Sequence, residues 1–348
     1  MSAAEQLSFG GMPQRLYPCT PTRLTSWLDC PRRYRMTYLD RPPPRKGPPW
    51  AHNSLGASVH NALAGWWRLP RPARSVTAAG DLLQAGWIGQ GFADEQQSAR
   101  QRSRARAMVE SYVATLDPAD EPLGVERTVA ARTDRIAVSG RIDRLDERPA
   151  GVDEHAADAG QWRADAGQRP ADMGGPPAGA GGPPAGAGGP PAGAGGPPAG
   201  AGRPAAPPHR ATELIVVDYK TGRHLLTTDD ARSSLALALY AVAAARSLRR
   251  PCHRVELHHL PTGSVLGWEH TDATLARQIR RAEEIAAECD AADTACRSGL
   301  PPAELDEMFP PRPGPGCGWC DYRQHCPQGS AASPARRPWD GISDEPGR

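Results

Sequence analysis

The sequence has 348 residues, is 39% hydrophobic and has a formal net charge of +2, from 41 Lys+Arg against 39 Asp+Glu. This near-neutral balance excludes a general attraction to polyanions, so a nucleic-acid surface has to be a local patch. No apolar run reaches the ~18 residues of a membrane span, and the N-terminus lacks a signal-peptide layout. We therefore expect a cytoplasmic protein without a membrane partner, whose eight cysteines are free or metal-bound rather than paired.

The N-terminal third of the chain predicts helices. Residues 1–21 are polar and contain prolines, and we expect them to be flexible. Residues 24–38 have apolar side chains at helical spacing with a break near Pro31, because proline interrupts a helix. A second helix is predicted over residues 55–67, and one or two longer helices within residues 78–117.

The next part of the chain predicts strands. Residues 125–147 contain short alternating stretches that indicate two strands with a turn near Thr133 and Asp134. Residues 213–219 form a continuous apolar run of strand length, which is typical of a buried strand. The remaining expected elements are an apolar helix over residues 233–250, a hairpin over residues 253–270 and an amphipathic helix starting at Thr271 or Asp272.

A segment of low complexity separates the two groups of strands. The unit GGPPAGA occurs four times in succession from Gly174 to Ala201. Such units cannot bury apolar area or sustain a helix, so we predict a disordered insertion over residues 150–211. Because a long loop is closed at little extra entropic cost, we place it in the turn of a β-hairpin. The predicted domain spans residues 22–327, and residues 328–348 are predicted to be a disordered tail.

Removing this insertion leaves a hairpin that carries an acidic residue on each arm. Asp143 lies near the end of one strand and Asp218 near the end of the next, with Lys220 two residues further on. Alternation along a strand places Asp218 and Lys220 on the same face. If the arms pair, Asp143 joins them. Two carboxylates in contact repel unless a cation lies between them, and oxygen ligands favour Mg²⁺ or Mn²⁺.

The lysine in this cluster is unusual for this chain. Only Lys46 and Lys220 are lysines, and every other Lys/Arg position is arginine. An ammonium is a compact charge whose pKa shifts on burial, whereas guanidinium stays charged. Lys220 can therefore orient an attacking water, help to deprotonate it and neutralise a pentavalent phosphate. An ordinary surface ion pair is the simpler alternative, but arginine would serve there equally well.

The stretches GRIDRLDE (Gly140–Glu147) and DYKTGR (Asp218–Arg223) resemble the RecB-type branch of the PD-(D/E)xK nuclease superfamily. The resemblance implies an α/β, restriction-endonuclease-like core, in which a mixed β-sheet is flanked by helices, and metal-dependent cleavage of DNA. It also implies a histidine in a G-x-x-x-H pattern as a metal ligand or phosphate contact, which here is His60. The carbonyl of Tyr219 is implied as a further metal ligand.

One more position follows from the resemblance, and another from its place at the start of a strand. The family has a Gln-x-x-x-Tyr helix that contacts the nucleic-acid backbone. Tyr240 fits its tyrosine, but Ala236 stands where the glutamine is expected, so Tyr240 can equally be a core residue. Glu126 is a weaker candidate for an extra acidic ligand.

Four cysteines form a second constellation. Cys317, Cys320 and Cys326 are spaced C-x2-C-x5-C, and three thiolates at this spacing can bind one inorganic centre that needs a fourth ligand. Iron–sulfur nucleases of the RecB/AddB type, and the related CRISPR-adaptation nucleases, have one cysteine before the nuclease core and three after it. The resemblance therefore implies a 4Fe–4S cluster held by Cys30 and the three C-terminal cysteines. Zinc remains the alternative, since four thiolates also make a closed tetrahedral site.

Basic and aromatic residues surround these cysteines in the sequence. We expect Arg32 and Arg33 to contact DNA, because arginines suit phosphates and the neighbouring aromatic rings suit the bases of a single strand, and the resemblance implies a contact of Tyr240 with the DNA backbone. Packing around the inorganic centre is the alternative for many of the rings.

The leading interpretation is a metal-dependent DNA exonuclease that acts on single-stranded ends in repair or recombination. No P-loop motif occurs in the sequence, so a helicase would be a separate partner. A DNA-binding scaffold that has lost cleavage and a nuclease for CRISPR spacer processing are the alternatives. The sequence gives no indication of the oligomeric state.

Overall fold

The computed structural model describes residues 15–149 and 212–342. The predicted insertion and its GGPPAGA repeats lie outside the described residues, as do residues 1–14 and 343–348. Among the described residues, none of the helices is both long and apolar enough to cross a bilayer.

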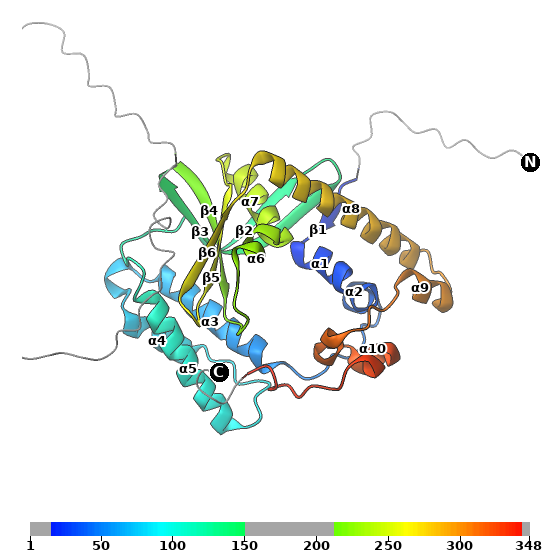
Figure 1. Cartoon of the computed structure of the whole chain (residues 1–348), viewed down its shortest axis with the longest axis horizontal. Helices are drawn as coiled ribbons and strands as arrows, with labels where there is room; N and C mark the ends of the chain where they lie inside the picture. Colours follow the sequence, from blue (N-terminus) through cyan, green and yellow to red (C-terminus); the bar gives the residue numbers. More distant parts are fainter. Residues whose placement is uncertain (1–14, 150–211, 343–348) are drawn as a thin grey trace, which may run out of the picture. The chain divides into compact units, whose positions relative to one another are not determined.

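A six-stranded mixed sheet forms the centre of the fold, with the order β1-β3-β4-β5-β6 and with β2 paired to β3. β2 and β4 run antiparallel to β3, β5 is parallel to β4, and β6 is antiparallel to β5. Helices flank this sheet (Figure 1), which confirms the predicted fold class. The strands are β1 (Tyr17–Cys19), β2 (Gly124–Arg132), β3 (Ile136–Pro149), β4 (Thr212–Lys220), β5 (Arg254–His259) and β6 (Ser264–Glu269).

Most of the helices begin where the sequence supplies a capping residue. The Thr20 hydroxyl accepts a hydrogen bond from the Arg23 N–H at the start of α1, and Thr271 caps α8 in the same way. Pro31 occupies the first turn of α2, where its missing N–H has no cost. The helices are α1 (Pro21–Asp29), α2 (Pro31–Tyr38), α3 (Ala51–Arg68), α4 (Val76–Ala85), α5 (Glu95–Val113), α6 (Thr228–Ser233), α7 (Leu235–Leu248), α8 (Asp272–Arg297), α9 (Pro302–Met308) and α10 (Pro327–Ala332).

β4 separates two hydrophobic layers, because its side chains are buried on both faces. Leu214 and Val216 pack into the layer of α7, α8 and α1, whereas Ile215 and Val217 pack into the layer of α3 and α5. In Figure 1 the two groups of helices lie on different sides of the sheet. The apolar run within residues 213–219 is thereby explained, since residues 214–217 are buried on both faces of the strand.

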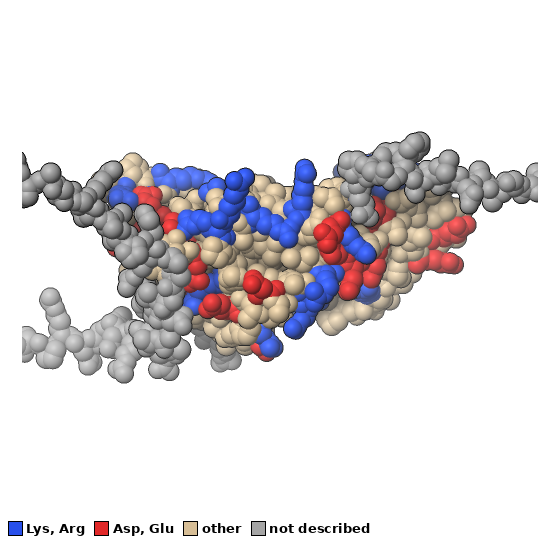
Figure 2. Space-filling view, turned by 90° about the horizontal axis from the view of Figure 1, so that it is seen from above, with Lys and Arg blue, Asp and Glu red and all other residues tan. Residues whose placement is uncertain are grey.

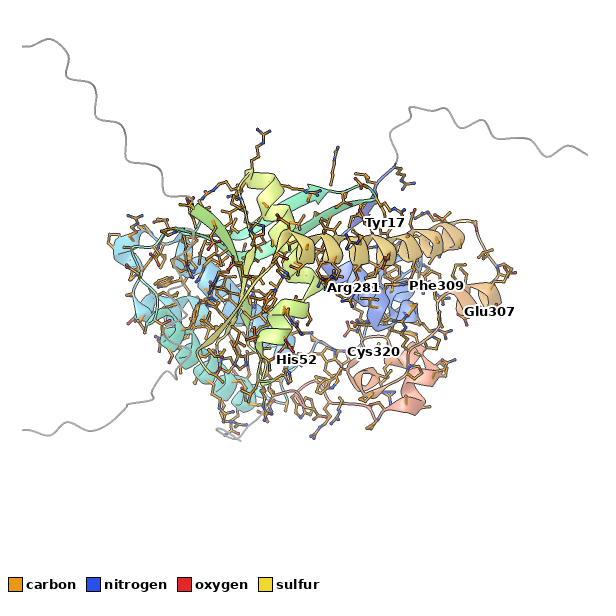
Figure 3. The ribbon with its side chains drawn as sticks, turned by 45° about the horizontal axis from the view of Figure 1, so that its top comes forward. Tyr17, His52, Arg281, Glu307, Phe309 and Cys320 are labelled. Carbon is orange, nitrogen blue, oxygen red and sulfur yellow. The ribbon has the colours of Figure 1, made fainter. Side chains whose placement is uncertain are left out.

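The N-terminal segment is more ordered than predicted. β1 pairs in parallel with the beginning of β3, with Tyr17 opposite Ile136, and Tyr17 and Cys19 are buried. The Tyr17 hydroxyl lies beneath α8 and donates a hydrogen bond to Asp293 over 3.0 Å (Figure 3). The prediction that residues 1–21 are flexible is therefore wrong for residues 17–21. A three-residue strand is too short to produce a visible alternation.

The C-terminal segment also differs from the prediction. α10 begins at Pro327, and the carbonyl of Pro338 accepts a hydrogen bond of 3.0 Å from the N–H of Ala51 at the start of α3. The predicted tail of residues 328–348 is thus structured over residues 328–342, because the chain packs back on α3. Acidic and basic side chains are interspersed on the face seen in Figure 2, so this face is not uniformly basic.

Candidate active site and metal centre

Three acidic residues lie in one row across the sheet. In the β2–β3 ladder Val125 is opposite Arg144 and Arg127 is opposite Ile142, so Glu126 stands opposite Asp143. In the β3–β4 ladder Arg144 is opposite Val217, so the next position brings Asp218 opposite Asp143 on the other side. The predicted pairing of the two acidic arms is therefore confirmed, and Glu126 extends the row to a third strand.

The backbone is irregular at this row. Ile142 and Leu145 both pack into the layer of α7, although residues three apart on a regular strand face opposite sides. The interruption coincides with Glu126, whose φ of 51° lies in the left-handed region. For a residue with a Cβ this conformation costs on the order of 1 kcal/mol. The regular alternation of side chains between the two faces of β3 is therefore interrupted between the core residue Ile142 and the acidic residue Asp143.

Asp143 is the centre of the contacts. Its Oδ1 lies 3.2 Å from Nδ1 of His60, and its Oδ2 accepts a hydrogen bond of 2.9 Å from the backbone N–H of Tyr219. One ligand atom each from His60, Glu126 and Asp143 lie within 4.8 Å of one another, which is the spacing of a metal site. These three residues come from a helix and two strands, so the tertiary fold assembles the group.

The second carboxylate pairs with the lysine. Nζ of Lys220 lies 2.6 Å from Oδ2 of Asp218, which confirms that the two side chains share a face. The contact has the distance of an ion pair but not the direction of a hydrogen bond, and Oδ2 of Asp218 is a buried oxygen without a hydrogen-bond partner. A buried oxygen in this condition can accept a further ligand, so the donor set fits a hard divalent cation.

Charge in the row shifts the pKa values of its neighbours. Burial raises the pKa of Asp218, Asp143 raises it further, and Lys220 opposes both effects. Burial lowers the pKa of His60, but the hydrogen bond to Asp143 and the charges of Asp143, Asp218 and Glu126 outweigh it, so the net pKa is raised above 6.5. A protonated His60 is thus favoured while no cation neutralises the carboxylates.

Tyr240 of α7 reaches the same place. Burial raises its pKa, and the charges of Asp218 and Asp143 raise it further. A Cβ at Gly140 would meet the Tyr240 ring at 2.3 Å, so only glycine lets this ring approach β3. Tyr240, His60 and Asp143 line one cavity of about 520 Å³. The tyrosine of the expected helix motif is therefore at the site, whereas Ala236 provides no side-chain amide.

His60 is positioned by the packing of α3. Val59 and Leu63 on either side of it are fully buried against the sheet, so the helix has little rotational freedom. Gly56, one turn earlier, lets α3 approach the end of β4, because a Cβ there would lie 3.3 Å from Oγ1 of Thr221. The side chain of Tyr219 faces the α3 layer, where it is buried, which leaves its backbone for the acidic row.

The four predicted cysteines lie around a second cavity, of about 340 Å³. Cys30 stands between α1 and α2, and the other three come from the turns before α10. The Gly329 N–H donates a hydrogen bond of 3.3 Å to Sγ of Cys326. A Cβ at Gly329 would lie 3.3 Å and 3.4 Å from the sulfurs of Cys326 and Cys317, so glycine keeps this space open.

The described cysteine sulfurs are not gathered as closely as the ligand atoms of the acidic site. In the parts of the chain that the structure describes, the one group of three ligand atoms within 4.8 Å of one another is that of His60, Glu126 and Asp143. No three cysteine sulfurs are therefore that close. Around one tetrahedral zinc, with Zn–S of ~2.3 Å, sulfurs lie about 3.8 Å apart. The four cysteines thus surround one cavity, with no three of their sulfurs within 4.8 Å of one another.

The two arginines predicted to contact DNA also line the cysteine cavity. Arg32 is 8% exposed and lies 3.4 Å from Asp306, so its guanidinium is engaged within the protein. Arg33 is more exposed and forms an ion pair of 2.6 Å with Asp29. The nearby aromatic residues Trp27 and Tyr34 are buried in the core. Packing around the cysteines is the role that these contacts support for Arg32, and Arg33 alone keeps an exposed face.

One comparison with known proteins gives a match. A family model described as the PD-(D/E)XK nuclease superfamily matches residues 18–156 and 208–327, which run from the second residue of β1 to just past the last of the four cysteines. No curated protein matches the chain. The unmatched gap, residues 157–207, falls inside the predicted insertion. With the acidic row and its lysine in place, the chain belongs to the PD-(D/E)XK nuclease superfamily.

Proposed function

We propose that the protein is a RecB-type DNA exonuclease that hydrolyses phosphodiester bonds with Mg²⁺ or Mn²⁺, acts on single-stranded ends and serves DNA repair or recombination. One observation carries this proposal. Glu126, Asp143 and Asp218 stand in one row on three paired strands, with Lys220 2.6 Å from Asp218 and His60 3.2 Å from Asp143. A core built only for stability has no need to gather three carboxylates.

The residues that would hold the cation are His60, Glu126, Asp143 and Asp218, together with the carbonyl of Tyr219. A bound divalent ion lowers the pKa of water and stabilises charge on a leaving oxygen. Lys220 supplies a positive charge, which the carboxylates cannot. Its side chain is 45% exposed, so the ammonium can reach a phosphate oxygen while it stays beside Asp218. The ammonium would neutralise the charge that develops on that phosphate.

The reaction balances without a further reactant. The oxygen of one water adds to phosphorus, and the bond between phosphorus and the leaving sugar oxygen breaks. The water loses one proton and the leaving oxygen gains one, so the products are a phosphomonoester and a hydroxyl group. Tyr240, whose ring lies over Gly140 beside the carboxylates, would contact the sugar–phosphate backbone.

We further propose that Cys30, Cys317, Cys320 and Cys326 hold a 4Fe–4S cluster. Two features support this over zinc: the sulfurs are not gathered at single-ion spacing, and they surround a cavity of about 340 Å³. The N–H of Gly329 directed at a cysteine sulfur suits a thiolate bound to a metal cluster. The cluster would link residues 30 and 317, which lie at opposite ends of the domain.

The test is a cleavage assay on end-labelled DNA with Mg²⁺ or Mn²⁺, after anaerobic purification. We expect cleavage by the wild type and a loss of about 1,000-fold or more in Lys220→Ala, since such charge stabilisation is worth several kcal/mol. The chain offers a matched control in Lys46→Ala, which removes the other lysine, and which should cleave normally.

Equal activity of Lys220→Ala and the wild type would refute the proposed role of the lysine. A wild type that binds DNA and Mn²⁺ but never cleaves would instead favour a DNA-binding scaffold protein. The presence of Ala236 in place of the expected glutamine supports that alternative. A requirement for a separate helicase, or a preference for CRISPR spacer precursors, would be found with the same labelled substrates. If the protein needs a separate helicase, it would cleave the labelled DNA only after that helicase is added.

A further inference from the structure

A large pocket lies next to the acidic site on the side of Lys220. Its volume is about 810 Å³, and it is bounded by α3, α5, the residues after β4, the β5–β6 turn and residues 341–342 of the C-terminal segment. It shares Gly56 with the cavity that holds His60 and Asp143. The two spaces therefore meet at Gly56 of α3, which faces Thr221 directly after the end of β4.

The lining of this pocket has one sign of charge. Arg104, Lys220 and Arg223 line it, and no aspartate or glutamate is among its described lining residues. The neighbouring cavity contains Glu126 and Asp143 instead. That cavity has one cation, Arg141, which forms an ion pair of 2.7 Å with Glu126, so cations predominate on the Lys220 side and carboxylates on the metal side. An anionic chain placed across both would have its reacting phosphate at the carboxylates and its next phosphates among the arginines.

The walls between these charges are apolar. Leu55 of α3 and Met108 of α5 line the pocket, and so does Leu225, which is 69% exposed and the most exposed large hydrophobic residue of the described chain. An inorganic anion gains nothing from such walls. A nucleotide does, because its base and sugar cover apolar surface while its phosphate meets the cations. The volume is in the range of small-ligand pockets and too small for a duplex.

The floor of the pocket is fixed by hydrogen bonds. His259 is 2% exposed, its Nε2 donates to the carbonyl of Gly222 over 2.7 Å, and its Nδ1 lies 2.7 Å from the hydroxyl of Thr262. The N–H of Leu260 donates to the carbonyl of Lys220 over 2.9 Å. The segment that carries Lys220 and Arg223 is therefore fastened to the β5–β6 turn, and a bound strand meets a preformed surface.

We propose that this pocket, called here the Arg104–Arg223 pocket, binds the nucleotides of a single strand that directly flank the scissile phosphate on the Lys220 side. Arg104 and Arg223 contact their phosphates, and Leu225 contacts a base. The inference rests on the proposed function, since it takes DNA as the substrate of the acidic site. It adds a binding surface whose chemistry selects a single strand over a duplex.

The experiment measures binding separately from cleavage. Fluorescence anisotropy follows a labelled oligothymidylate of about ten nucleotides, and a duplex of the same length, in buffer with a chelator. The variant Arg104→Gln/Arg223→Gln should bind the single strand about tenfold or more weakly, and its salt dependence should fall by about 1.4 in slope, ~0.7 for each lost phosphate contact. Arg246→Gln, an exposed arginine of α7 outside the pocket, is the matched control and should bind normally.

A second variant keeps the inference testable if the first fails to fold. Leu225→Glu places a carboxylate on a side chain that is already in solvent, so its melting temperature should be that of the wild type. Its single-strand affinity should fall about tenfold, whereas Val76→Glu, on the exposed surface of α4, should have no effect. Unchanged affinity in both pocket variants would overturn the inference. An equal loss of duplex binding would overturn its selectivity.

The remaining outcomes separate this inference from the proposed function. If the wild type cleaves DNA and the pocket variants bind and cleave like it, the pocket proposal fails and the nuclease proposal stands. If the single strand binds in the pocket but no DNA is ever cleaved, the nuclease proposal fails alone. A labelled oligoglutamate peptide that binds more tightly than the oligothymidylate would replace DNA by an acidic protein partner, and would overturn the inference.

Discussion

The acidic site and the cysteine site are built in different ways. Glu126, Asp143 and Asp218 stand next to paired positions of three neighbouring strands, so the strand pairs beside them hold their backbones in place whether or not an ion is bound. The cysteines stand on the connection between two helices and on short turns, and only the chain around each sulfur fixes its place. Strand pairing alone therefore holds the acidic site together, whereas the cysteine site depends on the inorganic group that its sulfurs would bind.

The two sites also differ in what they hold together. The acidic site lies within neighbouring strands. The cysteine site joins the connection of α1 and α2 to the last turns of the domain, and its surroundings reach back to α3. Trp50 donates a hydrogen bond of 2.8 Å to Asp321, and the N–H of Gly47 donates one of 2.8 Å to the Asp321 carbonyl. Loss of the cation from the acidic site should therefore stop cleavage and leave the fold intact. Loss of the bound group from the cysteine site should lower the stability of the fold.

The largest expected effect comes from Asp143→Asn. We predict a loss of cleavage of about 1,000-fold or more, because Asp143 is the carboxylate that contacts both His60 and the Tyr219 N–H, and an amide is a poor ligand for the cation. Binding of Mn²⁺, measured by calorimetry, should be lost as well. The melting temperature should stay within about 3 °C of the wild type, since the strand ladder remains.

Asp134→Asn, on the exposed turn between β2 and β3, is the matched control for Asp143→Asn and should behave as the wild type does. If Asp143→Asn unfolded the domain, the acidic site would be structural in the same sense as the cysteine site. The contrast between the two regions would then be wrong.

Cys30→Ser should have the opposite signature. We predict loss of the broad absorbance near ~400 nm and of bound iron and sulfide, which are the marks of iron–sulfur ligation. The melting temperature should fall by about 5 to 15 °C, because a lost cross-link costs ~2–5 kcal/mol and 1 kcal/mol corresponds to ~2–4 °C in a domain of this size. Limited proteolysis should cut the chain near its C-terminal turns.

Cys296→Ser, a half-buried cysteine on α8 away from the cavity, is the control for the chemistry of the substitution and should keep both iron and stability. A colourless wild-type protein with one zinc after anaerobic preparation would exclude the iron–sulfur cluster. A Cys30→Ser protein that loses iron but melts normally would show that the cluster does not join the ends of the domain.

The sequence predicted the fold where a regular pattern covered a whole element. The buried run of β4, the apolar helix α7 and the caps of α8 are local signals, and the pairing of the acidic arms followed from them. β1 and α10 were missed because each is short, and each is stabilised by contacts with distant segments, such as Tyr17 with Asp293.

The site was predictable in part for the same reason. Asp143, Asp218 and Lys220 follow from strand ends and alternation. Glu126 does not, because placing it opposite Asp143 requires the register of the hairpin to the residue, and a turn centred at Thr133 and Asp134 would put Gly140 or Arg141 there instead. Its left-handed backbone also leaves no mark in the sequence. The Arg104–Arg223 pocket joins a helix to a strand end, so no motif indicates it.

The smallest expected effect concerns the acidic site without an ion, and it is the contribution of His60 to stability as the pH changes. In the metal-free protein the pKa of His60 is raised above 6.5, since Asp143 of β3, Asp218 of β4 and Glu126 of β2 all face it and outweigh its burial. A group whose pKa is raised on folding stabilises the fold below its unfolded pKa, and this contribution is lost as the pH rises through the folded pKa. Metal-free wild type should therefore exceed His60→Gln in unfolding free energy at pH 5 to 6, and the difference should shrink toward alkaline pH.

Denaturant unfolding in a chelator, repeated across this pH range, measures the difference, and His224→Gln on the exposed loop after β4 is the matched control. Mn²⁺ should reverse the trend for the wild type, because the cation competes with the proton on His60 and its affinity rises as that proton leaves. A difference that grows with pH in the metal-free protein would mean that His60 is neutral beside Asp143. The sheet alone would then hold the carboxylates of Glu126, Asp143 and Asp218 close together, without a positive charge on His60 of α3 to offset their repulsion.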